Sequence, residues 1–343
     1  MTIRFRVADI DADRANLIRL FQRNLTPAYD ARKFDWLYRR NPHGKAVGWV
    51  AYEEGSGKIV GASAGFPRRL HGYGREELGL ILGDLCMEEE YRSMGPALQL
   101  QKATMAAVNE QPFVFCYDFP SRSMMAIYKR LGFEKTGELQ RWAKPLRLER
   151  HIERVVKSKA LSRVFARIPN FFLGRRGHKR QRREYEVAIQ EGRCGEEFTL
   201  FDRRFHAFPV LRTKRTHDFL NWRYLDHPSA QHQMLVARQQ DALVGYAVLT
   251  TGPENPAIVD LSALDQPAAA TLISAASEHL RKQGAETVSL YANQDHCWST
   301  VFEGAGFRPR ESAPMVSYAS PSSRMAESRS NEKWWVMAGE RES

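Results

Sequence analysis

The stretch that decides the fold is residues 80–97, Leu80-Ile81-Leu82-Gly83-Asp84-Leu85-Cys86-Met87-Glu88-Glu89-Glu90-Tyr91-Arg92-Ser93-Met94-Gly95-Pro96-Ala97. The apolar run 79–87 predicts a buried strand, and 96–108 predicts a helix that begins at a proline. Backbone N–H groups at such a helix start are unpaired and favour an anion. We therefore expect a phosphate-binding turn, in which Gly95 permits close approach and Arg92 adds positive charge.

The segments around this turn predict a mixed α/β domain. A strand and two helices are followed by antiparallel strands and then by strand, helix, strand, helix and strand. This order differs from the alternating elements of a Rossmann fold. We expect a central mixed, mostly antiparallel sheet flanked by helices. The expected strands are 3–7, 48–53, 58–66, 79–87, 113–117 and 134–145, and the expected helices are 11–23, 33–40, 96–108 and 123–130.

The second half of the chain repeats this pattern. Three short strings recur in the same order, which favours duplication of one domain over chance similarity. We expect the second copy to begin near 185–190, to contain a helix at 272–282 and a strand at 288–291, and to end with a strand at 333–337. The strings are W-x-Y-x-x-x-P at 36–42 and 222–228, Val-Gly at 60–61 and 244–245, and Gly-Phe at 132–133 and 306–307.

The net charge of +11 is concentrated between the two copies. Residues 144–183 hold 14 Lys and Arg against Glu149 and Glu153, and the rest of the chain is close to neutral. We predict an N-terminal catalytic domain at 1–146, a basic amphipathic connector at 147–184 and a C-terminal domain at 185–343. The connector either packs on a lobe or contacts an anionic membrane or an acidic carrier. Nucleic acid is not an expected partner, because the charge is not spread over a folded face.

Composition excludes several classes of protein. No apolar run is long enough to span a bilayer, and residues 1–6 lack the apolar core of a signal peptide. The cysteines lie far apart and form no CxxC pair, which argues against a zinc ribbon or a disulfide framework. We expect a reduced, cytoplasmic protein without a metal, or one that is peripheral to the membrane through its connector. The four cysteines are Cys86, Cys116, Cys194 and Cys297.

Two motifs of the first copy together resemble the acyl-CoA site of the GNAT (GCN5-related N-acetyltransferase) superfamily. One is the turn at 92–97, R-x-x-G-x-A, and the other is Y-x-x-x-G-F at 128–133. The resemblance implies two tandem GNAT-like domains that use acetyl-CoA or another acyl-CoA as co-substrate. Pro96 departs from a standard turn, since it has no N–H to donate to a phosphate. The cofactor-binding residues that the resemblance implies are Met87, Arg92, Ser93, Met94, Gly95 and Ala97.

The resemblance also implies catalytic residues. It places Tyr128 near the thioester sulfur as a general acid, whereas the alternative is a core tyrosine on an amphipathic helix. Asp84, on the strand that flanks the thioester, is the favoured general base, direct or through water. Glu88 and Asp118 are weaker alternatives for the base.

The second copy lacks these features. Residues 259–268 contain no Arg-x-x-Gly, Phe302 replaces the tyrosine, and Asp265 would repel a pyrophosphate. We expect a degenerate copy that completes the acceptor pocket or stabilises the first copy, as in tandem GNAT and Fem-type transferases. The expected function is acyl transfer from CoA to a small amine, for example an amino sugar in surface polysaccharide synthesis. The alternatives are a donor on an acyl carrier protein or aminoacyl-tRNA, and a non-catalytic binding scaffold.

Overall fold

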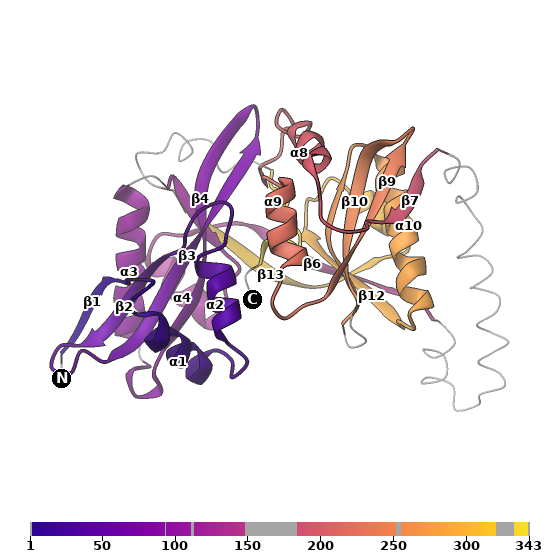
Figure 1. The fold of residues 1–343 in the computed structure, drawn as a ribbon. Helices are drawn as coiled ribbons and strands as arrows, with labels where there is room; N and C mark the ends of the chain where they lie inside the picture. Colours follow the sequence, from indigo (N-terminus) through magenta and orange to yellow (C-terminus); the bar gives the residue numbers. More distant parts are fainter. Residues whose placement is uncertain are drawn as a thin grey trace.

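Two similar runs of elements make up the protein (Figure 1). The computed structural model describes residues 2–92, 94–110, 113–147, 184–251, 255–319 and 333–341. The first run contains β1 (Ile3–Val7), α1 (Arg14–Asn24), α2 (Ala31–Tyr38), β2 (Val47–Glu53), β3 (Ile59–Gly72), β4 (Arg75–Met87), a 3-10 turn (Glu89–Tyr91), α3 (Met94–Glu110), β5 (Phe115–Asp118), α4 (Arg122–Arg130) and β6 (Glu134–Pro145). The second run contains β7 (Glu186–Ile189), α8 (Glu196–Arg203), β8 (Arg212–Thr213), α9 (His217–Leu220), a π-helical turn (Asn221–Leu225), β9 (His232–Gln239), β10 (Ala242–Thr250), β11 (Ala257–Ala263), α10 (Gln266–Lys282), β12 (Thr287–Asn293), α11 (Ser299–Gly304), β13 (Arg308–Ala319) and a 3-10 turn (Ala338–Glu340).

The described strands of both runs join in one mixed sheet. Their order is β1-β2-β3-β4-β5-β13-β6-β12-β11-β10-β9-β7, and β8 pairs with β3 beside this path. β13 of the second run lies between β5 and β6 of the first, and β6 lies between β13 and β12 near the middle of the molecule (Figure 1). The pairs Val316↔Asp118 and Leu290↔Trp142 fix two of these registers. Thus β13 of the second run pairs between two strands of the first run, and β6 of the first run pairs between two strands of the second.

A pair of tryptophans relates the two runs. Trp36 Nε1 donates to the carbonyl of Trp222 at 2.7 Å, and Trp222 Nε1 donates to the carbonyl of Trp36 at 2.9 Å. Their rings stack with centroids 4.8 Å apart and an interplanar angle of 18°. Such a reciprocal contact between equivalent positions is the geometry of a two-fold interface.

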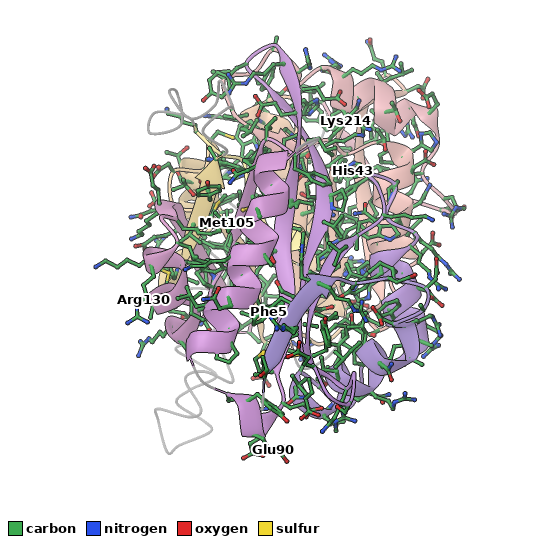
Figure 2. The ribbon with its side chains drawn as sticks, turned by 90° about the vertical axis from the view of Figure 1, so that its left-hand side faces the viewer. Phe5, His43, Glu90, Met105, Arg130 and Lys214 are labelled. Carbon is green, nitrogen blue, oxygen red and sulfur yellow. The ribbon has the colours of Figure 1, made fainter. Side chains whose placement is uncertain are left out.

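Helices cover both faces of the first half of the sheet. Leu17 and Phe21 of α1 share a buried cluster with Ile81 of β4. Met105 of α3 packs on the opposite face with Leu82, and Figure 2 shows α3 lying across that face. These contacts follow from the alternation of side chains along β4. The mixed α/β fold with a largely antiparallel sheet, predicted from the sequence, is confirmed.

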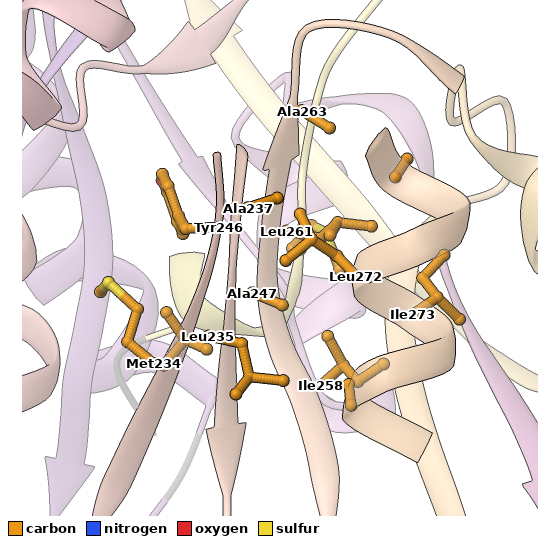
Figure 3. Packing of buried hydrophobic residues seen from close by; sticks show 14 of the residues in the cluster. Met234, Leu235, Ala237, Tyr246, Ala247, Ile258, Leu261, Ala263, Leu272 and Ile273 are labelled. Carbon is orange, nitrogen blue, oxygen red and sulfur yellow. The ribbon is translucent and has the colours of Figure 1, made fainter. Parts of the chain in front are cut away.

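The second half is built around α10. Leu272 and Ile273 of this helix are fully buried in a cluster with Ile258 and Leu261 of β11. Figure 3 shows Leu272 next to Leu261. Asp265 begins the helix, because its carboxylate accepts a hydrogen bond from Ala268 N at 2.8 Å. This is the N-cap arrangement that satisfies one unpaired donor of the first turn.

One predicted strand is wrong. Residues 333–337 make only isolated bridges, Trp334 to Leu211 and Met337 to Ala292, before the 3-10 turn. The strand that completes the second run is β13, whose first residues are polar and exposed and so lack an alternating apolar pattern. The basic connector predicted at 147–184 lies outside the described residues except at its two ends. No helix in the described part of the chain is long and apolar enough to cross a membrane.

Candidate functional site

β4 and β5 are paired over a short distance only. Among the described residues, their parallel ladder joins Gly79–Ile81 to Phe115–Tyr117, although β4 continues to Met87. The pairing of β3 with β4 shifts by one residue between Ala62 and Ala64, which marks a bulge in β4. Asp84 lies in this bulge and has a φ of +48°. A bulge redirects a side chain and ends regular pairing. The carboxyl half of β4 therefore has a free edge toward β5.

Asp84 lies at this bulge with two tyrosines. Its Oδ2 accepts hydrogen bonds from the Tyr29 hydroxyl at 2.6 Å and from the Tyr38 hydroxyl at 3.0 Å. Burial raises the pKa of Asp84 above its usual value, and these two hydrogen bonds oppose the shift. Burial also raises the pKa of Tyr29 and of Tyr38, so both phenols stay protonated and donate to the carboxylate. The two hydrogen bonds hold the Asp84 carboxylate in one orientation.

Tyr128 lies on α4 and is almost fully buried. Its hydroxyl donates to Asp118 Oδ2 at 2.6 Å, and its ring packs on Phe133 with centroids 4.4 Å apart. Burial, followed by the charge of Asp118, raises the pKa of Tyr128 well above its usual value. Burial raises the pKa of Asp118 to about 6, against the hydrogen bond from Tyr128. The two residues therefore form a coupled proton-holding pair.

The two predicted catalytic residues lie on opposite faces of the sheet. Asp84 contacts Tyr38 of α2, on the face covered by α1 and α2. Tyr128 packs with Leu80 and Leu82, on the face covered by α3. The free edge of β4 lies between them.

The turn that leads into α3 has the predicted strand-turn-helix form. Gly95 is exposed, and a Cβ at this position would meet nothing within 4 Å, so the helix start is open to a ligand. The Arg92 guanidinium donates to the Met87 carbonyl at 3.2 Å and to Asn24 Oδ1 at 2.9 Å. Asn24 at the end of α1 thus orients Arg92, a role that no sequence motif indicates.

The other predicted residues of the turn divide into three groups. The Met87 side chain is buried in a cluster with Leu100, so only its backbone faces the turn. Ala97 lies in the first turn of α3 and is partly buried. Ser93 and the side chain of Met94 lie outside the described residues. Of the alternative bases, Glu88 accepts hydrogen bonds from Arg23 and Asn24, whereas Asp118 holds Tyr128.

Comparison with known proteins identifies the fold. No protein-family model matches the chain, and no curated protein matches it by sequence. A probable N-acyltransferase of unknown function from Enterococcus faecalis is similar with a TM-score of 0.69 and 12% identity, over 93% of this chain and 72% of that one. A GCN5-related N-acetyltransferase from Anabaena variabilis is similar with a TM-score of 0.68 and 13% identity, over 92% and 73%.

The chain has the GNAT fold. A further similar structure is a GCN5-related glucosamine N-acetyltransferase region of a fungal multi-domain β-N-acetylglucosaminidase. Its TM-score is 0.58 at 12% identity, over 92% of this chain and 38% of that one. The GNAT fold predicted from residues 92–97 and 128–133 is therefore confirmed, and the roles of the individual site residues stay predictions.

The second run of elements, called the second unit below, differs at the corresponding helix start. There the Asp265 carboxylate caps α10, so the chain's own anion occupies the position where a phosphate would bind. Tyr185 donates to the same carboxylate at 3.2 Å. Phe302, at the position of Tyr128, is fully buried and has no proton to donate. In the described residues, no group of three His, Cys, Asp or Glu side chains is placed to hold a metal ion.

Asp118→Asn should change how stability depends on pH. Because the folded protein raises the pKa of Asp118 from 3.8 to about 6, the native state keeps this proton longer than the unfolded chain does. The associated stability is fully present below about pH 4 and is lost as the pH rises through 6. Asn cannot ionise and still accepts the Tyr128 hydrogen bond. The variant should match the parent at pH 4 and exceed it by about 2 kcal/mol at pH 7.5 in urea unfolding. Equal pH dependence in both proteins would contradict the shift.

Proposed function

We propose that the protein is an acyl-CoA-dependent N-acyltransferase, with acetyl-CoA as donor and a small amine as acceptor. The observation that carries this proposal is the placement of Asp84 and Tyr128 on opposite faces of the sheet, near the point where the β4–β5 ladder ends. The open helix start at Gly95 lies next to the same strand end. A thioester and an amine need a proton acceptor and a proton donor in this relation.

Each group has one task in the transfer. Acyl-CoA supplies the acyl group as a thioester. Asp84 accepts the proton that the amine loses as its nitrogen bonds to the acyl carbon. The carbon–sulfur bond breaks, and Tyr128 gives its proton to the leaving sulfur. Tyr128 regains its proton from solvent and Asp84 releases the one it accepted, while Asp118 holds the Tyr128 hydroxyl in place. The free edge of β4 and the turn at 92–97 would hold the donor, with Arg92 fixed by Asn24.

The fungal glucosamine N-acetyltransferase region supports an amino sugar as one acceptor class. On this proposal the protein works in the cytoplasm and supplies an acylated amine, for example for surface polysaccharide synthesis. The second unit contributes strands and packing but no second donor site, because Asp265 blocks its helix start.

Acetyl-CoA should protect the protein against thermal unfolding. At a concentration about one hundred times its dissociation constant, a ligand stabilises the native state by about 2.7 kcal/mol. Gly95→Glu should abolish this protection, because it adds a negative charge at the helix start in a position with open space. Gly304→Glu is the matched control, since a side chain at Gly304 in the second unit also meets nothing within 4 Å. Absence of any shift with the parent protein would sink the proposal.

A further inference from the structure

The second unit retains the carboxylate of the proposed acceptor site. Asp84 lies three residues before the β4 residue that ends the β3–β4 ladder. Asp260 lies three residues before the β11 residue that ends the β10–β11 ladder. The two carboxylates therefore occupy equivalent positions of the repeated hairpin. The two end pairs are Gly61↔Met87 and Gly245↔Ala263.

The partners of these carboxylates are equivalent as well, with one difference. Tyr224, which corresponds to Tyr38 in the repeated W-x-Y string, donates to Asp260 at 2.8 Å. At the position of Tyr29, nine residues before Tyr38, the second unit has Arg215. The Nε of Arg215 donates to Asp260 Oδ2 at 2.8 Å, and both groups are fully buried. The second unit thus pairs its carboxylate with its own cation, which also pairs with the buried Glu340.

The first unit has no such cation. Tyr29 offers a neutral hydroxyl to Asp84, and both tyrosines bind Oδ2. Among the described residues, no donor contacts Asp84 Oδ1 and no Lys or Arg forms an ion pair with this carboxylate. Asp84 is partly buried, and a carboxylate at such a site is less stable without a partner cation than with one. The first unit therefore lacks the ion pair that Arg215 makes with the equivalent carboxylate of the second unit.

A separate cation lies beside Tyr29. The Lys33 ammonium lies over the ring of Tyr29, 4.9 Å from its centroid, and it lowers the pKa of Asp84. Lys33 makes no ion pair with any residue that the structure describes. Its equivalent in the second unit is the buried Phe219, so the charge is a feature of the first unit alone. Tyr29 thus lies between the Asp84 carboxylate, which its hydroxyl contacts, and the Lys33 ammonium, which lies over its ring.

We propose that Asp84, Tyr29 and Lys33 form a dipolar acceptor site, which takes a small amine that also carries a carboxylate or phosphate. The ammonium of the acceptor binds Asp84, and its anionic group binds Lys33. This proposal rests on the proposed function and names the substrate class. It predicts that cationic amines without an anionic group are poor acceptors.

The test measures release of the CoA thiol from acetyl-CoA with matched amines. The pairs are glucosamine 6-phosphate with glucosamine, and glycine with glycine methyl ester. The anionic member should have a kcat/KM about tenfold higher in at least one pair, because a hydrogen bond between charged groups supplies this factor. The phosphate and carboxylate pairs show which anion the site takes. Lys33→Met should remove the preference, whereas Arg32→Met, on the same helix with a side chain 79% exposed, should keep it.

Tyr29→Arg provides a second variant. It places in the first unit the cation that Arg215 provides in the second, and it should abolish amine turnover while acetyl-CoA still protects against unfolding. Equal kcat/KM within both pairs, or a preference that survives Lys33→Met, would overturn the dipolar site. Protection by acetyl-CoA together with such a result would leave the proposed function standing. If no amine is acetylated and none raises the melting temperature, the dipolar site is also overturned.

Discussion

Tyr128→Phe should lower the turnover number about a hundredfold, since a positioned general acid contributes a factor of this size. The affinity for acetyl-CoA should stay within about twofold of the parent value. The reason is that the substitution removes one hydroxyl, which contacts Asp118, while the ring and its packing on Phe133 remain. Turnover is measured by thiol release at saturating acetyl-CoA, and affinity by thermal protection.

Tyr318→Phe is the matched control for this experiment. Tyr318 packs on the same Phe133, with centroids 5.7 Å apart, and among the described residues its hydroxyl bonds only to the exposed Asn109. Its turnover should be unchanged. If Tyr128→Phe also retains full turnover, Tyr128 is a core tyrosine and not the proton donor.

Separating the two halves should have the largest effect on folding. Residues 1–146 alone should not form a stable domain, because β6 would lose both neighbours, β12 and β13, and β5 would lose β13. Residues 185–343 alone would leave β12 and β13 without β6. Unpaired strand edges of this kind favour aggregation. Each fragment should show no cooperative urea transition and no protection by acetyl-CoA.

The two fragments produced together should associate and restore both properties. A full-length chain cut by a protease within 147–184 should likewise remain folded, since the strand pairs that join the two runs, β5–β13, β13–β6 and β6–β12, lie outside this segment. If residues 1–146 fold alone and are protected by acetyl-CoA, the exchanged strands are dispensable. The intact protein is the reference in each measurement.

Much of the fold is predictable because the deciding patterns are local. β1 and β6 have the predicted bounds, and β1 is a short alternating run of the kind that local pattern determines. The strand exchange is not predictable in this way, because the apolar pattern of a strand does not specify its neighbour. β13 was also missed, since its exposed first half is polar.

In the candidate site, too, the residues of local motifs are predictable from the sequence and the contacts made by tertiary packing are not. The turn at 92–97 and Tyr128 are visible as motifs, because their spacing is fixed by one strand and one helix. The bond from Tyr128 to Asp118 depends on how α4 packs against the end of β5. Tyr29 and Tyr38 reach Asp84 from far along the chain, and no motif marks Tyr29. The repeated W-x-Y string was the available signal, because it aligns Tyr38 with Tyr224.

The reciprocal bonds of Trp36 and Trp222, together with the exchanged strands, have an evolutionary consequence. A single-copy ancestor with the same pairing could have completed its sheet only by trading strands with an identical subunit. Joining the copies in one chain made that association independent of protein concentration. It would also free one partner from the identity that a symmetric pair imposes, so that Arg215 could replace Tyr29 and Asp265 could close the helix start that stays open at Gly95.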